Sequence, residues 1–280
     1  MRLGSFGGGS FGDSFLPYWQ VARRSFQRYA TYRGATAAGV FTNTLFGFMK
    51  VAVLLAVYRQ AAGPGGRIGA FDETDVVTFT FVSQGLLTTM GAYVGMQLAE
   101  RIRSGDVVAD LYRPLHFPGY WLAHDLGRAG YQLLARGLPP VLIGALVFTY
   151  RLPPDGRAAA AFALSLGLAA LVSFAIRYLV ILSGFWVVDV RGPWSLTGFV
   201  LMFFAGLIVP LNFFPAWLDR LARMTPFPAL VQTPIEIFLG KAPGGAAAAL
   251  AYQAVWAAAL LALAERVTRR AFRKVVVHGG

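Results

Sequence analysis

The sequence contains no cysteine and little charge. The absence of cysteine from its 280 residues excludes disulfide frameworks, Cys-ligated zinc, iron–sulfur clusters and thiol nucleophiles. Charged residues make up only 14% of the chain against 56% hydrophobic residues, and the mean hydropathy is +0.57. A soluble protein surface requires a larger polar share than this. The composition therefore predicts a chain whose solvent is a lipid bilayer.

Motifs for catalysis and nucleotide binding are also missing. The sequence has no G-x-x-x-x-G-K-[ST] phosphate loop, and its Gly-rich residues 63–66 lack the Lys-Ser/Thr pair that phosphates and magnesium require. His116, His124 and His278 are too scattered for an H-E-x-x-H metal site, and no G-x-S-x-G elbow occurs. We expect no catalytic residue, metal or cofactor in this chain.

Long apolar segments are what the sequence has in quantity. A helix needs roughly 20 apolar residues to cross the hydrocarbon of a bilayer. Six segments meet or approach that length: residues 34–58, 76–99, 129–150, 158–188, 192–218 and 246–264. Pro139 and Pro140 predict a kink in the third. The predicted fold class is an all-α polytopic membrane protein with six transmembrane helices.

The basic residues that give the net charge of +12 lie beside these spans, mainly before the first, after the second and after the last. Flanks rich in Lys and Arg face the cytoplasm, which predicts that both termini are cytoplasmic and explains the charge without nucleic acid. We expect residues 1–16 to form a flexible tail. The flanking residues are Arg23, Arg24, Arg28, Arg33, Arg101, Arg103, Arg113, Arg128, Arg266, Arg269, Arg270, Arg273 and Lys274.

Residues 17–33 are predicted to form an amphipathic helix in the cytoplasmic interface of the membrane. At about 100° per residue, aromatic and small residues share one arc, and basic residues occupy the opposite arc. Such a helix either anchors the chain to the membrane surface or also contacts a cytosolic partner. Its candidate residues are Trp19, Arg23, Arg24, Phe26 and Arg28.

The connection between the second and third spans, residues 100–125, is predicted to carry a short helix. Asp106 is placed to cap its start and Pro114 to end it. Helical spacing puts Asp106, Asp110 and Arg113 on one face. The segment is either an ordinary amphipathic loop helix or an element that docks into a cytosolic motor.

The chain after the fifth span is interrupted by Pro210 and Pro215. Backbone groups freed there need partners in protein or water, which predicts an extracellular re-entrant helical hairpin with arms at residues 216–224 and 230–239. Phe213 and Phe214 then lie either near the outer mouth of a pathway or in the interfacial aromatic belt. The candidate outer-gate residues are Pro210, Phe213, Phe214 and Pro215.

Three charged residues fall inside the predicted spans, where each costs roughly 2.5–3.5 kcal/mol. Lys50 is the deepest and is predicted to face either a subunit interface or a transport pathway. Arg136 and Arg177 are expected to snorkel or to lie at cytoplasmic ends.

The order of these parts resembles the type-2 family of ABC export permeases, in the subgroup that keeps its ATPase on a separate polypeptide. The resemblance runs from about Tyr18 to Gly280. Its most specific pieces are S-G-D-x-x-x-x-L-x-R-P at residues 104–114, P-L-x-F-F-P at 210–215, F-L-G-K at 238–241 and the terminal Gly279-Gly280.

The resemblance implies one transmembrane domain, residues 17–280, with interface helix 17–33, coupling-helix loop 100–125 and re-entrant region 214–241. It implies a multi-pass protein of the bacterial cytoplasmic membrane that exports a substrate by alternating access. Its partners would be two copies of an ABC ATPase, which bind ATP and Mg, and a second permease that is identical or related. The ATPase-coupling candidates are then Arg103, Asp106, Asp110, Arg113 and Pro114.

Two other function classes compete with this interpretation. A secondary transporter driven by an ion gradient also needs polar groups and broken helices near the midplane, but it is expected to carry internal repeats, and none is seen between the halves. An intramembrane enzyme would need a converging nucleophile and base or a metal set. The cargo stays open among a drug-like cation, a lipid, a peptide and a glycan.

Overall fold

The computed structural model describes residues 11–63, 66–90, 96–187 and 189–274. It is 81% helix, with no strand in these ranges. The helices are α1 (Phe11–Ala30), α2 (Arg33–Ala62), α3 (Glu73–Met90), α4 (Met96–Ser104), α5 (Val107–Leu111), α6 (Phe117–Gln132), the π-helical turn η1 (Leu133–Gly137), α7 (Leu138–Val147), α8 (Gly156–Leu182), α9 (Arg191–Phe204), α10 (Ala216–Arg223), α11 (Gln232–Phe238) and α12 (Gly245–Phe272). Three short 3₁₀ turns complete the set: η2 (Ser183–Phe185), η3 (Leu211–Phe213) and η4 (Phe227–Leu230).

The amino-terminal helix starts earlier than the sequence predicts. Helix α1 begins at Phe11, so the predicted tail over residues 1–16 is wrong for its last six residues, 11 to 16. Pro17 lies inside the helix rather than in its first turn. Residues 1–10 and the terminal Gly279-Gly280 lie outside the described part of the chain.

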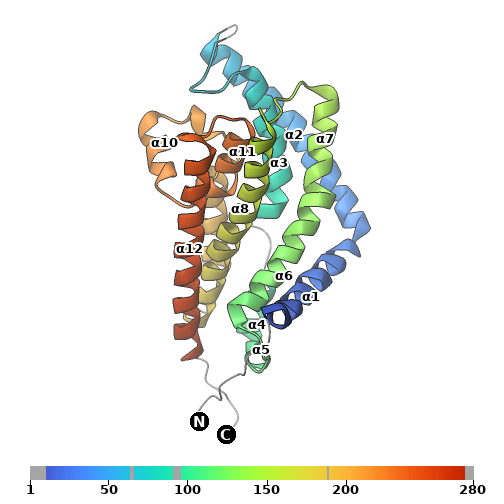
Figure 1. Ribbon diagram of the computed structural model, residues 1–280, viewed down its shortest axis with the longest axis vertical. Coiled ribbons are helices and arrows are strands. Elements are labelled where there is room, and N and C mark those ends of the chain that lie inside the picture. The colour runs from blue at the N-terminus through green and yellow to red at the C-terminus, as the bar shows by residue number, and fades with distance from the viewer. Residues whose placement is uncertain (1–10, 64–65, 91–95, 188, 275–280) are drawn as a thin grey trace.

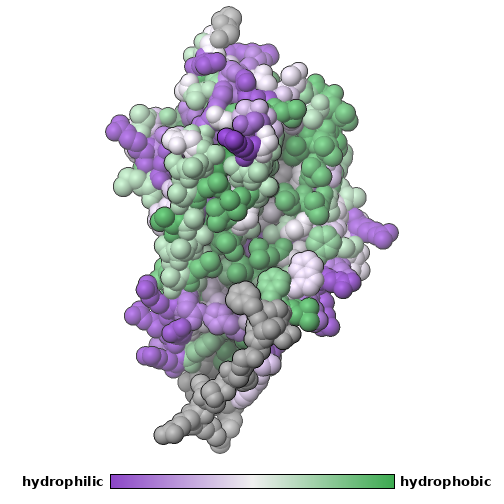
Figure 2. Space-filling view, viewed as in Figure 1, coloured by the Kyte–Doolittle hydropathy of each residue, from purple (hydrophilic) through white to green (hydrophobic). Residues whose placement is uncertain are grey.

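Four helical stretches are long and apolar enough to cross a membrane: Arg33–Ala62, Phe117–Val147, Gly156–Phe185 and Gly245–Phe272. They run along the long axis of the molecule (Figure 1). Figure 2 shows hydrophobic residues over the middle of the molecule and hydrophilic residues gathered towards its two ends. This distribution is the one that a bilayer requires of a helical bundle.

Helix α3 is the centre of the bundle. Fourteen of its 18 residues are buried, among them Phe79, Phe81 and Leu86. Protein rather than lipid surrounds it, so it also tolerates buried polar residues such as Thr80 and Gln84. The predicted second span, residues 76–99, covers α3 and the start of α4, and residues 91–95 between them lie outside the described residues.

The predicted third span begins too late. Its helix runs from Phe117 to Val147 through α6, η1 and α7, so residues 117–125 of the predicted loop 100–125 belong to α6. The π-helical turn η1 lies directly before Pro139 and Pro140. Prolines lack the N–H that a regular helix needs, and a wider turn before them is one way to accommodate the missing bonds.

The predicted fifth span, residues 192–218, is not one continuous helix. Helix α9 ends at Phe204, and Gly206 adopts the left-handed backbone conformation with φ +82°. The Gln232 side chain accepts a hydrogen bond from the Leu211 backbone at 3.1 Å, and the Gln232 backbone donates to the Ala205 carbonyl at 3.1 Å. These two bonds give partners to the Leu211 N–H and the Ala205 carbonyl, which lie where the helix is interrupted. Beyond the break, helices α10 and α11 cover nearly the same residues as the two predicted arms, and their re-entrant arrangement stays a prediction.

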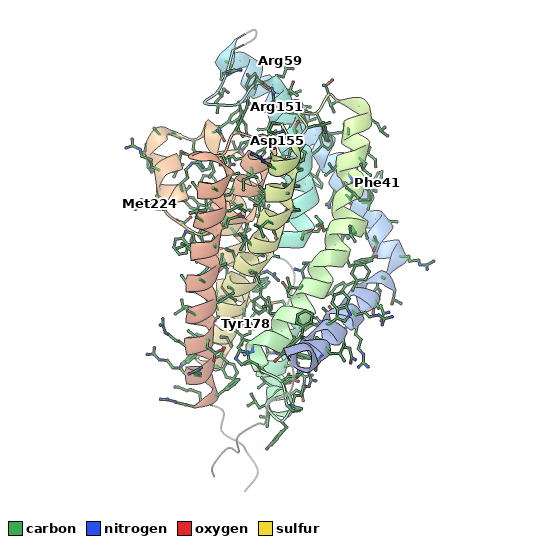
Figure 3. All side chains as sticks on the ribbon, in the orientation of Figure 1. Phe41, Arg59, Arg151, Asp155, Tyr178 and Met224 are labelled. Carbon is green, nitrogen blue, oxygen red and sulfur yellow. The ribbon has the colours of Figure 1, made fainter. Side chains whose placement is uncertain are left out.

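A cluster of charges, here called the three-loop cluster, joins segments that are distant in sequence at one end of the bundle. Asp75 is fully buried, and its carboxylate accepts from Arg151 Nε at 2.5 Å and from the Lys241 ammonium. Arg151 also pairs with Asp72. The loops before α3, before α8 and before α12 are thereby tied together. Figure 3 shows Arg59, Arg151 and Asp155 at this end.

The opposite end of the bundle holds α1, α4, α5 and the carboxyl-terminal end of α12 (Figure 1). Helix α1 lies obliquely beside α6. Helix α12 continues through Arg266, Arg269 and Arg270, well beyond the predicted span end at Ala264. Basic residues from three elements therefore lie at this end.

Candidate functional site

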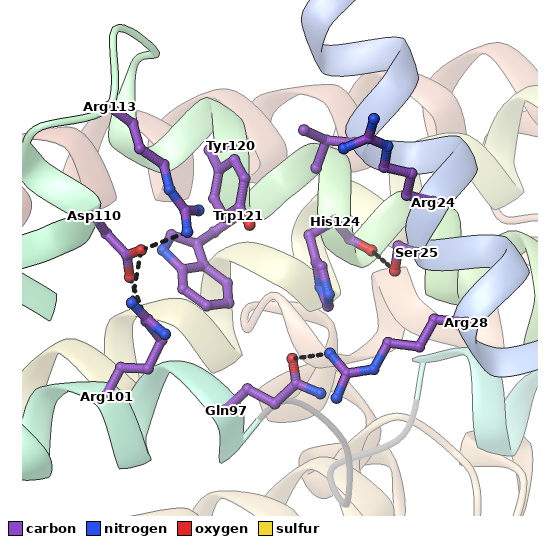
Figure 4. Close-up of a pocket in the computed structure, with 11 residues that line it drawn as sticks. Arg24, Ser25, Arg28, Gln97, Arg101, Asp110, Arg113, Tyr120, Trp121 and His124 are labelled. Carbon is purple, nitrogen blue, oxygen red and sulfur yellow. Dashed lines mark hydrogen bonds and ion pairs between the residues drawn. The ribbon is translucent and has the colours of Figure 1, made fainter. Parts of the chain in front are cut away.

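Helix α5 is held by a compact set of ion pairs on Asp110. The side chain of Asp110 is only 1% exposed. Arg101 of α4 donates to its two carboxylate oxygens, from Nε at 2.5 Å and from Nη2 at 2.9 Å. Arg113 pairs with the same carboxylate at 3.0 Å, and its guanidinium lies 4.6 Å from the centre of the Tyr120 ring. Figure 4 shows Arg101 and Arg113 on either side of the carboxylate. Bidentate pairing with arginine fixes geometry as well as charge.

Arg101 also links α5 to α4 through the backbone. Its guanidinium donates to the Asp106 carbonyl at 3.1 Å. Val107 on α5 is buried among apolar residues that include Leu98 and Trp121. The short helix is therefore attached to the end of α4 by charge and by packing, so that α4 and α5 form one unit.

Helix α1 is seated closely on α6. Ser25 Oγ donates to the His124 carbonyl at 2.7 Å, and Tyr18 Oη accepts from the His116 backbone at 3.1 Å. A Cβ on Gly127 would lie 2.0 Å from the Ala22 carbonyl oxygen, so only glycine permits this approach of the two backbones. Phe26 meets Tyr131 edge to face.

A cavity of about 490 Å³ lies between α1, α4, α5 and α6 (Figure 4). We call it the basic cavity, since four arginines and one aspartate line it together with neutral residues. Its lining consists of Val21, Arg24, Ser25, Arg28, Gln97, Arg101, Asp110, Arg113, Tyr120, Trp121 and His124. Arg28 donates to the Gln97 side chain at 3.5 Å.

A second hollow, of about 760 Å³, flanks the contact between α1 and α6. We call it the apolar groove, because Trp19, Phe26, Leu122 and Leu126 are among the residues that line it. Trp19 is 57% exposed. The interface-helix candidates therefore divide: Trp19, Arg23 and Phe26 belong to the apolar groove, and Arg24 and Arg28 to the basic cavity.

Deeper in the bundle, two arginines and an aspartate surround the carboxyl-terminal end of α3. Asp125 accepts from Arg128 Nε at 2.8 Å and from Arg177 Nη2 at 2.7 Å. Arg128 donates to the carbonyls of Thr88 and Thr89. Arg177 does not snorkel, because it is 4% exposed and paired inside the protein, and its predicted place at a cytoplasmic end stays a prediction.

The remaining coupling candidates lie outside the Asp110 pairs. Asp106 occupies the position before α5, but its side chain makes no cap bond and accepts instead from Ser104 Oγ at 2.8 Å; its predicted capping role is wrong. Arg103 pairs with Glu100 on the exposed face of α4. Pro114 follows the end of α5 at Leu111.

The predicted outer-gate residues surround the break after α9. Phe214 stacks on Phe203 with ring centres 4.9 Å apart, and Phe213 packs against the main hydrophobic core. Pro210 and Pro215 precede η3 and α10 respectively. Their role in gating stays a prediction.

Lys50 reaches across two segments from α2. Its ammonium donates to Ser83 Oγ of α3 at 3.2 Å and to the Leu207 carbonyl beyond α9 at 2.6 Å. Hydrogen bonds to protein thus compensate for its place inside a span. A role in the pathway stays a prediction.

A family comparison decides the class of protein to which this bundle belongs. The model of the ABC-2 family transporter protein matches residues 45–279, which is most of the chain. The chain belongs to the ABC-2 transporter family. No curated protein matches the sequence. ABC-2 permeases are membrane-embedded transporter subunits, generally without catalytic activity, and they partner with ABC ATPases. The described residues of this permease contain no group of three or more metal-ligand side chains.

Sequence reasoning missed several residues that build the site of this ABC-2 permease. Arg101 appeared only as a flanking charge, because nothing in its spacing from Asp110 indicates that the chain turns back between them. Ser25 and Asp125 gave no signal either, since each acts through a partner far away in sequence. Gln232 lies in the predicted second arm, but its partners Leu211 and Asn212 lie in a different segment.

Proposed function

We propose that this chain is the permease subunit of an ABC exporter and that ATP hydrolysis in a separate subunit drives it. The observation that carries the proposal is the buried Asp110 carboxylate. Two arginines form ion pairs with it, and all three side chains line the basic cavity. A short helix fixed in this way can transmit a push without deforming. Family membership supports the same assignment.

The proposed topology has six spans. The four long apolar helices supply four of them, and α3 with α4, and α9, supply the other two. Helices α10 and α11 form the re-entrant hairpin on the extracellular side. Both termini are cytoplasmic, because the basic end that holds α1, α5 and the last turns of α12 then obeys the positive-inside rule. The membrane is the bacterial cytoplasmic membrane.

The proposed assembly contains two permeases and two ATPase subunits. The second permease is either identical or a related chain. ATP and Mg are bound by the ATPase subunits, and this chain holds no cofactor. The coupling residues are those of the α4–α5 unit, with Asp110, Arg101 and Arg113 at its centre.

The mechanism is alternating access. Closure of the ATPase pair moves α5, and Arg101 passes this movement to α4. In the chain, α4 follows α3. Arg128 donates hydrogen bonds to the carbonyls of Thr88 and Thr89 at the end of α3. The central helix of the bundle is therefore the element that responds, and the bundle reopens from inward to outward.

The test compares Asp110→Asn with Asp189→Asn in the full chain, purified with its ATPase and reconstituted. Asp189 is an exposed acidic residue at the same end of the molecule and serves as the control. We expect Asp110→Asn to retain folding and ATPase binding. The number of substrate molecules transported per ATP hydrolysed is expected to fall about tenfold or more, which corresponds to about 1.4 kcal/mol in coupling. Unchanged coupling in Asp110→Asn, or flux that persists on an ion gradient without the ATPase, contradicts the proposal.

A further inference from the structure

We infer that the basic cavity binds the phosphate group of an anionic phospholipid. This inference goes beyond the transport function and does not depend on the direction of transport. The basic cavity is lined by Arg24, Arg28, Arg101 and Arg113, and Asp110 is its single acidic residue. Arg101 and Arg113 are engaged with Asp110. The arginines of α1 are therefore the ones available to an anion.

Arg24 and Arg28 project into the basic cavity from one face of α1, opposite α4 and α5 (Figure 4). Within the described part of the chain, Arg24 has no hydrogen-bond or ion-pair partner, and Arg28 has only the 3.5 Å bond to Gln97. Guanidinium groups bind phosphate through two parallel N–H donors. Two such groups on one helix face form a suitable site for a phosphate.

Trp121 supplies an independent sign of a ligand. It lines the basic cavity and is 8% exposed, and its Nε1 has no hydrogen-bond partner among the described residues. An indole N–H is a donor only, and leaving it unpaired when buried costs free energy. A buried donor that lines a cavity of net positive charge matches an acceptor that carries negative charge.

The size and place of the basic cavity favour a lipid as the source of that acceptor. Its volume of about 490 Å³ lies within the roughly 300–1,000 Å³ of ligand pockets. It borders α1, which lies at the basic end of the apolar band. Phospholipid phosphates are concentrated at this level of a membrane, and basic pockets between helices bind anionic headgroups there.

The experiment measures lipid binding to the purified full chain by native mass spectrometry, with phosphatidylglycerol and phosphatidylcholine in competition. We expect phosphatidylglycerol to bind preferentially. The double variant Arg24→Gln/Arg28→Gln is expected to weaken its binding about tenfold or more, and Trp121→Phe, which removes the Nε1 donor and shortens the ring system, about threefold. The control Arg33→Gln/Arg266→Gln removes two exposed arginines outside the basic cavity and is expected to leave the binding unchanged.

Inorganic phosphate and an ATPase pull-down form the other arms. Displacement of the lipid by millimolar phosphate, with the same dependence on Arg24 and Arg28, supports the inference, because it shows that the lipid is held through its phosphate group. Equal binding of the two lipids, or equal phosphatidylglycerol binding in both double variants, overturns the inference. Loss of the ATPase in Arg24→Gln/Arg28→Gln with unchanged lipid binding also overturns it, since the basic cavity then serves a protein. If the double variant fails to fold, Trp121→Phe decides.

Discussion

The two ends of this permease both bury an aspartate between two cations, but the paired residues lie at very different separations in the sequence. Asp75 in the three-loop cluster draws Arg151 and Lys241 from loops far away in sequence. Asp110 is paired within its own segment, by Arg101 and Arg113. The first arrangement cross-links the bundle, whereas the second joins α4 to α5 and leaves the contact with α6 to the packing of Val107 against Trp121 and of Arg113 against Tyr120. The first cluster ties three segments of the chain together, and the second makes one local unit.

The largest expected effect follows from breaking the three-loop cluster. Asp75→Asn leaves Arg151 and Lys241 with only Asp72 as an acidic partner. Since both cations are partly exposed, the expected loss is about 2–3 kcal/mol, at the lower end of what breaking a buried pair costs. Thermal unfolding in detergent measures this loss. In the control Glu73→Gln, the exposed pair with Arg59 is removed, and we expect a loss below about 1 kcal/mol. Equal losses in the two variants contradict the cross-linking role.

A smaller effect is expected where α1 meets α6. Gly127→Ala places a methyl group 2.0 Å from the Ala22 carbonyl oxygen, which forces the helices apart and costs about 1–3 kcal/mol. Gly130→Ala is the matched control, because its methyl group meets only the Phe26 ring at 3.8 Å. It is expected to be neutral or to stabilise by up to about 1 kcal/mol. Thermal unfolding distinguishes the two, and an unaffected Gly127→Ala variant argues against the close seating of α1.

Asp110→Asn is expected to cost less stability than Asp75→Asn, about 1–2 kcal/mol. The arginines on Asp110 are 32% and 40% exposed, so water replaces part of what they lose, whereas Lys241 on Asp75 is only 19% exposed. Thermal unfolding of the two variants side by side measures the difference. A larger loss for Asp110→Asn reverses the comparison between the two ends.

The smallest expected effect is a loss of stability at acid pH. Partial burial alone raises the pKa of Asp72, but bonds to Asp75 and the charges of Lys241 and Arg151 lower it below its ordinary value. A carboxyl with a lowered folded pKa stabilises the protein above its unfolded pKa of about 3.9, and the contribution is lost as the pH falls through the folded value. Stability is thus expected to fall below about pH 4, and less steeply in Asp72→Asn. If stability depends on pH in the same way in the unchanged chain and in Asp72→Asn, Asp72 does not make this contribution.

Hydropathy predicted the apolar helices well, because burial in lipid acts on each segment by itself. The first, fourth and last predicted spans all coincide with long helices, and the arms at residues 216–224 and 230–239 correspond to α10 and α11. The fifth span failed because hydropathy does not register the left-handed turn at Gly206.

The ion pairs could not be predicted for the opposite reason. Asp75 lies in the first turn of α3, and Lys241 and Arg151 come from two loops; no local pattern specifies that these segments meet. The Asp110 pairs are local, but they depend on a turn between Ser104 and Val107 that places Arg101 against α5. Composition indicated where charges flank spans, and only the fold indicates which charges meet.

The central claim is that α5 moves with ATP binding by a partner, and its most direct test is a distance. Since the chain has no cysteine, spin labels can be attached to Tyr112→Cys, next to α5 and 79% exposed, and to Arg270→Cys on α12. In the complex with the ATPase, we expect ATP and Mg to shift the distance between the labels, and Asp110→Asn to abolish the shift. A distance that is the same with and without nucleotide contradicts the account.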